Sequence, residues 1–97
     1  MPIKWLDEAI NDLINIRQFI ARDKPGAAKK MAEKIKTETR ILLDYPNAGR
    51  SGRVEGTREL VIADIPYYVP YRVKKQRIEI LRVLHGAMFN PLPIRNP

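Results

Sequence analysis

The chain has 97 residues, of which 44% are apolar and 30% charged, proportions typical of one globular domain and not of a disordered chain. Cysteine is absent, which excludes disulfides and thiolate metal sites, and no apolar run approaches the roughly 20 residues that span a bilayer. The formal net charge of +7 favours a nucleic acid or an acidic protein as partner over a purely solubilising role.

The N-terminal half predicts a strand followed by two helices. Residues 2–6 form a short strand candidate, and residues 6–23 then change to a helical period. The first helical stripe consists of Ala9, Leu13, Ile16 and Ile20. A second helix is predicted from Pro25, which suits a first helical turn, to about Leu42, with its stripe weakest at Glu38 and Thr39. Two amphipathic helices with a short joint predict an antiparallel hairpin.

The C-terminal half changes to strand patterning after a basic, glycine-rich loop over residues 49–56. Three strands are predicted, over 57–64, 67–73 and 78–85. Pro70 lies inside the second of them, which predicts an edge position or a bulge there because proline cannot donate to the ladder. We therefore predict an α+β fold of order β-α-α-β-β-β, with the helix hairpin packed on an antiparallel sheet. Residues 1–97 form one domain in this prediction, with an extended proline-rich tail over about 89–97.

The last predicted strand carries an arginine and the single histidine in an otherwise apolar run. A buried, unpaired guanidinium is costly, so a structural role for Arg82 requires a carboxylate, and Glu59 in the neighbouring strand is the expected partner. The alternative is a direct functional role for Arg82. His85, where the strand ends, is equally consistent with a hydrogen-bonded terminal histidine and with a site residue.

The chemistry that the sequence can support is arginine chemistry. The usual phosphate-loop, metalloprotease and serine-hydrolase motifs are absent, and no metal or cofactor site is expected. Guanidinium groups bind phosphate in a forked geometry, tyrosines stack on bases, and a histidine can move a proton in RNA cleavage. A basic sheet can also gather such residues by chance. The candidates on the predicted sheet are Arg50, Arg53, Arg58, Arg72, Arg82, His85, Tyr68 and Tyr71.

Several separate blocks of the chain resemble the RelE/ParE superfamily of bacterial toxins. They are "W...A..DL..I..FI", "P..GR.GRV.GTREL", "YYVPYRV" and "IEILRVLHGA", in this order and spacing from Trp5 to about Ala87. The resemblance implies the toxin of a type II toxin–antitoxin module, a helix hairpin on an antiparallel sheet, and neutralisation by a small cognate antitoxin. It also implies a cytoplasmic protein, in line with the absence of a secretory signal pattern.

Members of this superfamily act in different ways, and the resemblance leaves three functions open. ParE-like members poison DNA gyrase, which would use the basic sheet and the C-terminal segment. RelE-like members cut mRNA on the ribosome, and a non-toxic member would bind its antitoxin and tune operator occupancy. Tyr68, Glu59 and Val61 stand where the ribosome-dependent nucleases usually place basic residues, and Met88, Phe89 and Asn90 where they supply a tyrosine or a further basic residue. These departures favour gyrase.

The expected site residues differ between these functions. For a metal-free ribonuclease, the expected residues are His85 as general acid or base, with Arg58, Arg72 and Arg82 holding phosphate. For a gyrase inhibitor, the expected target-binding residues are Arg50, Arg53, Arg72, Tyr68 and Phe89.

Overall fold

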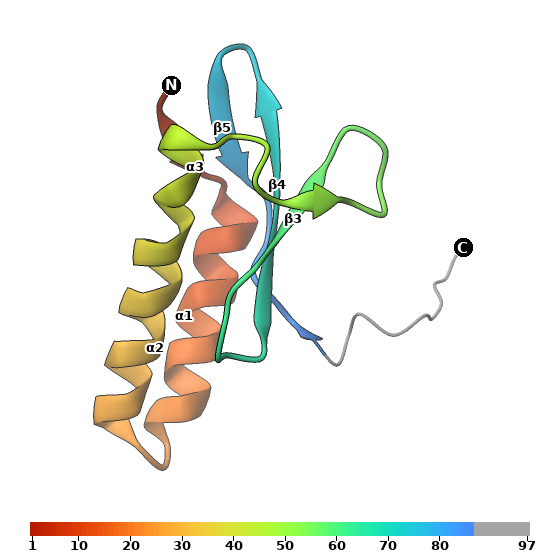
Figure 1. Ribbon diagram of the computed structural model, residues 1–97. Coiled ribbons are helices and arrows are strands. Elements are labelled where there is room, and N and C mark those ends of the chain that lie inside the picture. The colour runs from red at the N-terminus through yellow and green to blue at the C-terminus, as the bar shows by residue number, and fades with distance from the viewer. Residues whose placement is uncertain (87–97) are drawn as a thin grey trace.

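The computed structural model describes residues 1–86 and has two long helices side by side on one face of a sheet (Figure 1). Phe89 and the predicted tail lie outside these residues. The N-terminal elements are β1 (Ile3–Trp5), α1 (Asp7–Ala21), α2 (Pro25–Thr39) and the short α3 (Ile41–Asp44). The sheet continues with β2 (Arg50–Ser51), β3 (Arg58–Val61), β4 (Tyr67–Lys74), β5 (Arg77–Ile80) and β6 (Leu84–His85). The predicted α+β fold is confirmed.

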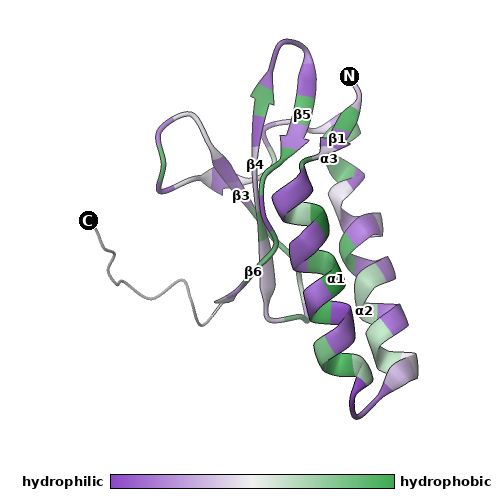
Figure 2. Ribbon diagram, turned by 180° about the vertical axis from the view of Figure 1, so that it is seen from behind, coloured by the Kyte–Doolittle hydropathy of each residue, from purple (hydrophilic) through white to green (hydrophobic). Residues whose placement is uncertain are grey.

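The helix layer follows the predicted apolar stripes, with one break. Hydrophilic and hydrophobic residues alternate along both long helices, as Figure 2 shows. The second predicted helix divides into α2 and α3, which differs from the single helix expected to Leu42. The break lies where the stripe is weakest: the Thr39 hydroxyl donates to the Lys36 carbonyl at 2.7 Å, and the Arg40 amide donates to Thr37 instead of continuing the α-helical pattern. The tighter i→i+3 bonding ends α2 there.

The strands form one sheet in the order β1-β5-β4-β3-β2, with β6 also paired to β4. All strand pairs are antiparallel except β1 with β5, which is parallel. The first strand therefore adds a parallel edge to the predicted antiparallel sheet. Lys75 and Gln76 connect β4 to β5 with φ of 52° and 61°. A two-residue hairpin turn whose strands follow the natural twist requires positive φ at both positions.

The last predicted strand is not continuous, because a bulge separates β5 from β6. The amides of Leu81 and Arg82 both donate to the Pro70 carbonyl, at 2.9 and 3.4 Å. Two residues opposite one are typical of a β-bulge. Pro70 therefore lies in the interior of the sheet and opposite a bulge. The ladder is already irregular at this point, so the N–H that proline lacks is not missed there. The bulge also shifts the alternation of faces, so Val83 rather than Arg82 joins the core.

The core lies between the helices and the inner face of the sheet. It comprises Ala9, Ile35, Leu42, Leu60, Ile62, Val69, Tyr71, Ile78, Ile80 and Val83. Because side chains alternate along a strand, the residues between these core positions point to the opposite side of the sheet, here called the outer face. Neither long helix of the described chain combines the length and the apolarity needed to cross a bilayer.

Candidate functional site

The outer face of the sheet carries most of the cationic side chains that the sequence singled out. The ladder register places Lys4, Glu79 and Arg72 next to one another across three strands. Lys74 and Arg77 are paired one step closer to the β4–β5 turn, and Arg50 pairs with Glu59 at the other edge. These positions alternate with core residues, so their side chains point away from the helices. The sheet therefore has an apolar inner face and a basic outer face.

Glu79 holds two guanidinium groups on the outer face. Arg72 Nε lies 2.6 Å from Glu79 Oε1, and Arg77 Nε lies 2.8 Å from Oε2, with a further contact from the Arg77 terminal nitrogen. Glu79 is only 2% exposed, whereas the side chains of Arg72 and Arg77 are 38% and 44% exposed. The hydrogen bonds from Arg72, and then those from Arg77, lower the pKa of Glu79 below its ordinary value. One buried carboxylate thus fixes two exposed arginines side by side.

We predict that Glu79 makes the fold sensitive to acid. A carboxylate whose pKa is lower in the folded state stabilises the protein fully above its unfolded pKa, near 4.5, and this stabilisation is lost as the pH falls through the lowered folded value. Urea denaturation between pH 7 and pH 3 should show the loss below about pH 4.5. Glu79→Gln should be less stable at pH 7 and should flatten that part of the profile. An unchanged profile in Glu79→Gln would contradict this role.

Glu59 organises the other end of the outer face. Its Oε1 lies 3.1 Å from the Arg50 terminal nitrogen and 3.2 Å from Arg50 Nε, and its Oε2 accepts from the Arg53 amide at 3.3 Å. The Arg50 guanidinium also lies over the Tyr68 ring, 6.0 Å from the centroid. These contacts tie the β2–β3 loop to the sheet and position two of the predicted target-binding arginines.

A hollow of about 410 Å³ on the outer face gathers several of the predicted site residues. It is lined by Arg53, Val54, Thr57, Glu59, Tyr68, Pro70, Arg72, Leu81, Arg82 and Leu84. Tyr68 is only 6% exposed, and burial raises its pKa above 10. Its phenol therefore stays protonated, and its ring offers little surface on which a base could stack. The hollow can bind anions through guanidinium groups, without aromatic stacking.

The predicted Arg82–Glu59 ion pair is wrong. Arg82 binds Asp12 of α1 instead, with 2.7 Å between Nε and Oδ2 and 3.1 Å between the terminal nitrogen and Oδ1. Glu59 is engaged with Arg50. Simple alternation from Ile78 and Ile80 would have turned Arg82 towards the core, and the bulge instead leaves it within reach of Asp12. The hydrogen bonds that Arg82 donates to Asp12 raise the pKa of Arg82 above its ordinary value.

Asp12 is a residue that the sequence reasoning missed, and it also accepts from the Val83 amide at 2.9 Å. A signal was present, because Asp12 lies three residues after Ala9 and four before Ile16, on the core-facing stripe of α1. A carboxylate at such a position needs a cation or several donors as partners.

Three of the residues expected for a nuclease, Arg58, Arg82 and His85, lie apart. Arg58 points to the inner side, where it donates to the Gly49 carbonyl at 2.8 Å and to the Asn47 carbonyl at 3.4 Å. His85 also lies on the inner side, with its ring edge-to-face with Tyr67 at 5.3 Å between centroids. The two are paired with β4 residues four positions apart, a separation of roughly 13 Å along the strand. Arg82 lies between them and is bound to Asp12.

Within residues 1–86, no group of three histidine, cysteine, aspartate or glutamate side chains is placed to hold a metal ion. The chemistry of the outer face is therefore that of fixed guanidinium and ammonium groups.

Comparison with known proteins identifies the family. Residues 3–88 match the family model described as the ParE toxin of the type II toxin–antitoxin system parDE. The chain belongs to the ParE toxin family. It is thus a type II toxin of the RelE/ParE superfamily, as the sequence blocks predicted, and a cognate antitoxin is its implied partner.

Named relatives of this ParE-family chain carry both superfamily labels. It is 45% identical over 84 residues to Y4kP of Sinorhizobium fredii, which covers 87% of this chain and 86% of the relative. It is 36% identical over 85 residues to the toxin RelE2 of Caulobacter vibrioides, covering 88% and 94%. A solved structure titled as the chromosomal ParDE system of P. aeruginosa matches with a TM-score of 0.83 and 33% identity, covering 88% of this chain and 95% of that one.

Proposed function

We propose that this ParE-family toxin arrests growth by inhibiting DNA gyrase through the outer face of its sheet. The observation that carries the proposal is the separation of two residue sets. Arg50, Arg53 and Arg72 lie together on the outer face around Glu59 and Glu79. Arg58 and His85, which a nuclease would need with them, point to the inner side. Arginines gathered on one face are sufficient for binding a target. General acid–base chemistry, in contrast, requires all its groups within hydrogen-bond reach of one substrate.

The alternative, ribosome-dependent mRNA cleavage, is tested in the same experiment. Purified toxin is assayed for inhibition of gyrase supercoiling and, separately, for mRNA cleavage in a translating extract. Inhibition of supercoiling without cleavage is the expected result. Cleavage without inhibition would replace the proposal with the nuclease function, and unchanged growth on induction would leave an antitoxin-binding member without a target.

We predict that His85→Ala keeps full toxicity. In the proposed function His85 packs against Tyr67 and touches no target, so growth arrest on induction should match the parent within about twofold. A nuclease that loses its general acid or base loses on the order of 10² to 10⁴ in rate. Growth curves of cells that express each variant at matched levels give the measurement, and recovery of growth with His85→Ala would contradict the gyrase proposal.

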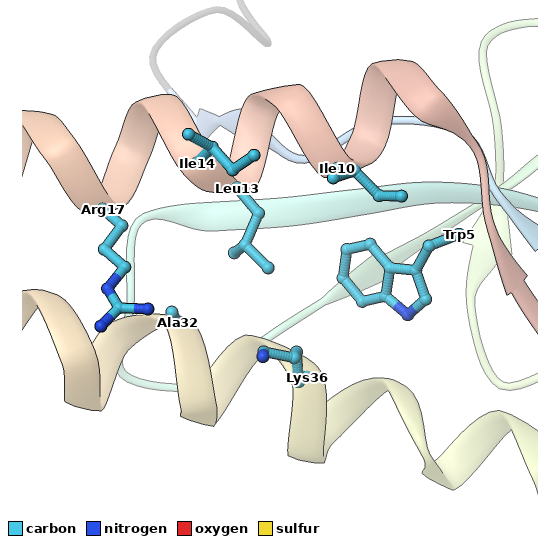
Figure 3. A pocket seen from close by; sticks show the side chains of 7 residues that line it. All are labelled: Trp5, Ile10, Leu13, Ile14, Arg17, Ala32 and Lys36. Carbon is cyan, nitrogen blue, oxygen red and sulfur yellow. The ribbon is translucent and has the colours of Figure 1, made fainter.

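We further propose that the antitoxin binds on the other side of the molecule, between the two long helices. A groove of about 360 Å³ there is lined by Trp5, by Leu13 and by Ile10 and Ile14 of α1, whose side chains are drawn in Figure 3. Ile10 and Ile14 are 42% and 47% exposed, which is unusual for isoleucine and typical of a surface that another protein covers.

The edge of this groove is cationic. Arg17 reaches from α1 towards α2, and Lys36 stands on the α2 side (Figure 3). An apolar groove with basic edges suits an amphipathic helix that carries carboxylates beside its apolar stripe. The same charge accelerates association with an acidic segment.

We predict that Ile14→Glu separates neutralisation from toxicity. Placing a carboxylate in the apolar groove should weaken antitoxin binding at least tenfold, about 1.4 kcal/mol, while gyrase inhibition is retained. Binding of the cognate antitoxin is measured by titration calorimetry. Phe19→Glu is the matched control, because Phe19 is an exposed apolar residue of the same helix that lines a different hollow. Equal weakening by both variants would remove the groove as the binding site.

A further inference from the structure

We propose that the outer face binds the phosphate backbone of duplex DNA, so that the toxin engages gyrase together with the DNA that gyrase holds. The inference rests on the proposed function and names the chemical component that the outer face recognises. Four features of the described residues carry it: the charge of the face, the geometry of its arginines, the scarcity of base-stacking surface and the lack of apolar side chains at its charged centre.

The charge of the outer face is strongly positive. Six cations gather there against two carboxylates, Glu59 and Glu79, which leaves a net charge of +4. Both carboxylates are buried and hydrogen-bonded to arginines or to backbone amides, so among residues 1–86 no ladder position of this face exposes an acid. The six cations are Lys4, Arg50, Arg53, Arg72, Lys74 and Arg77. An anion that approaches these ladder positions therefore meets no exposed carboxylate.

The arginines are held ready for phosphate. Glu79 engages Nε of both Arg72 and Arg77, so each guanidinium keeps a fixed orientation while a large part of it stays in water. The remaining N–H groups can bind phosphate oxygens, and little side-chain entropy is lost because the rotamers are already set. Lys4 flanks the pair on β1 and Lys74 lies at the β4–β5 turn, and no ion pair of either is present in the described structure.

The dimensions suit a duplex. From β1 to β2 the sheet crosses four inter-strand steps, about 19 Å in all at roughly 4.8 Å each. That length corresponds to five or six base pairs at about 3.4 Å of rise. Cations spread over this length can follow one backbone of a duplex.

The face lacks the surface that reads bases. Among the described ladder positions of the outer face, the aromatic residue is Tyr68. This residue is 6% exposed, and its ring lies under the Arg50 guanidinium. Proteins that bind single strands rely on exposed aromatic rings for base stacking. Contact to the backbone, independent of sequence, is what the outer face offers.

The face also lacks the anchors of a protein interface near its charged centre. The neighbouring positions Lys4, Glu79 and Arg72, and the pair of Lys74 and Arg77, include no apolar side chain. Interfaces between proteins take most of their binding energy from buried apolar and aromatic anchors. On the outer face exposed apolar side chains lie away from this centre, at Val54 and Val61, whereas the groove between the helices has Ile10 and Ile14 at its middle. The two sides of the molecule therefore suit two classes of partner.

Binding of a fluorescent 20-base-pair duplex to the full-length toxin, without gyrase, tests the inference. Anisotropy titrations from 50 to 200 mM salt should give a slope of log affinity against log salt of about −4, as expected for about four neutralised phosphates. The double variant Lys4→Gln/Lys74→Gln removes two exposed cations of the outer face and should reduce the slope by about 2. Lys29→Gln/Lys30→Gln, on the exposed side of α2, loses the same net charge and should leave the slope unchanged.

The inference would be overturned by no duplex binding at 50 mM salt, by equal effects of the two double variants, or by competition from polyglutamate as effective as that from unlabelled duplex. Tighter binding of a single strand of the same sequence would also overturn it, because stacking would then contribute. Supercoiling inhibition is measured on the same preparations. Inhibition without duplex binding removes this inference and leaves the gyrase proposal standing, whereas duplex binding without inhibition removes gyrase as the target.

Discussion

Replacing Tyr71 with phenylalanine should lower the free energy of unfolding by about 2 kcal/mol, although only one oxygen is removed. Tyr71 is fully buried, and its hydroxyl accepts from the Gly49 amide at 2.9 Å and donates to the Pro46 carbonyl at 2.8 Å. These two bonds fix the chain segment that leads from the helices into the sheet. Phenylalanine would leave both backbone groups with reduced solvation and no partner, and each such group costs on the order of 1 to 3 kcal/mol.

Urea denaturation at pH 7 gives the measurement for Tyr71, with Tyr45→Phe as control. Tyr45 is 64% exposed, so the same substitution should change stability by less than about 0.5 kcal/mol. Gly49→Ala probes the contact from the other side, because a Cβ at Gly49 would lie 2.6 Å from a Tyr71 ring carbon and 2.8 Å from its hydroxyl. It should destabilise the fold as well. Equal, small effects of the two tyrosine substitutions would mean that water replaces the hydroxyl.

Replacing Asp12 with alanine should cost about 2 kcal/mol of stability, the second large effect expected. Asp12 joins α1 to the segment between β5 and β6 through Arg82 and the Val83 amide. The Arg82 side chain is 41% exposed and regains water when its partner is lost, so most of the cost arises at the Val83 amide, which belongs to a core residue.

Asp12→Asn distinguishes these two contributions. Asparagine keeps an acceptor for the Val83 amide while removing the charge, so it should cost less than alanine, about 1 kcal/mol. Arg82→Ala combined with each variant completes a double-mutant cycle that isolates the ion pair. An asparagine variant as unstable as the alanine variant would show that the charge, and not the backbone bond, dominates.

Helical periodicity and strand alternation were sufficient to predict the fold. The stripe from Ala9 to Ile20 and the alternation of Tyr67, Val69, Tyr71 and Val73 follow directly from burial of one side of each element. The weak point of the second stripe coincided with the break between α2 and α3. The strand register then determines which residues share the outer face. Arg50 and Arg72, both predicted as target-binding residues, lie together on that face.

Local pattern could not predict contacts that depend on a single inserted residue. The bulge opposite Pro70 changes the side to which every later residue points, which brought Val83 into the core in place of Arg82 and left Arg82 within reach of Asp12. The role of Arg58 was equally hidden, because it depends on the path of the loop at Asn47 and Gly49. Phe89, the remaining predicted target-binding residue, lies outside the described chain.

The central claim is that the outer face of the sheet acts on gyrase, and charge reversal on two sides of the molecule tests it most directly. Gyrase supercoiling is titrated with the parent toxin, with Lys4→Glu/Lys74→Glu on the outer face, and with Lys29→Glu/Lys30→Glu on α2. The two variants change the net charge of the protein by the same amount. The account predicts at least about a tenfold loss of inhibition for the outer-face variant and little change for the helix variant. Inhibition that persists in the outer-face variant, or falls equally in both, would contradict it.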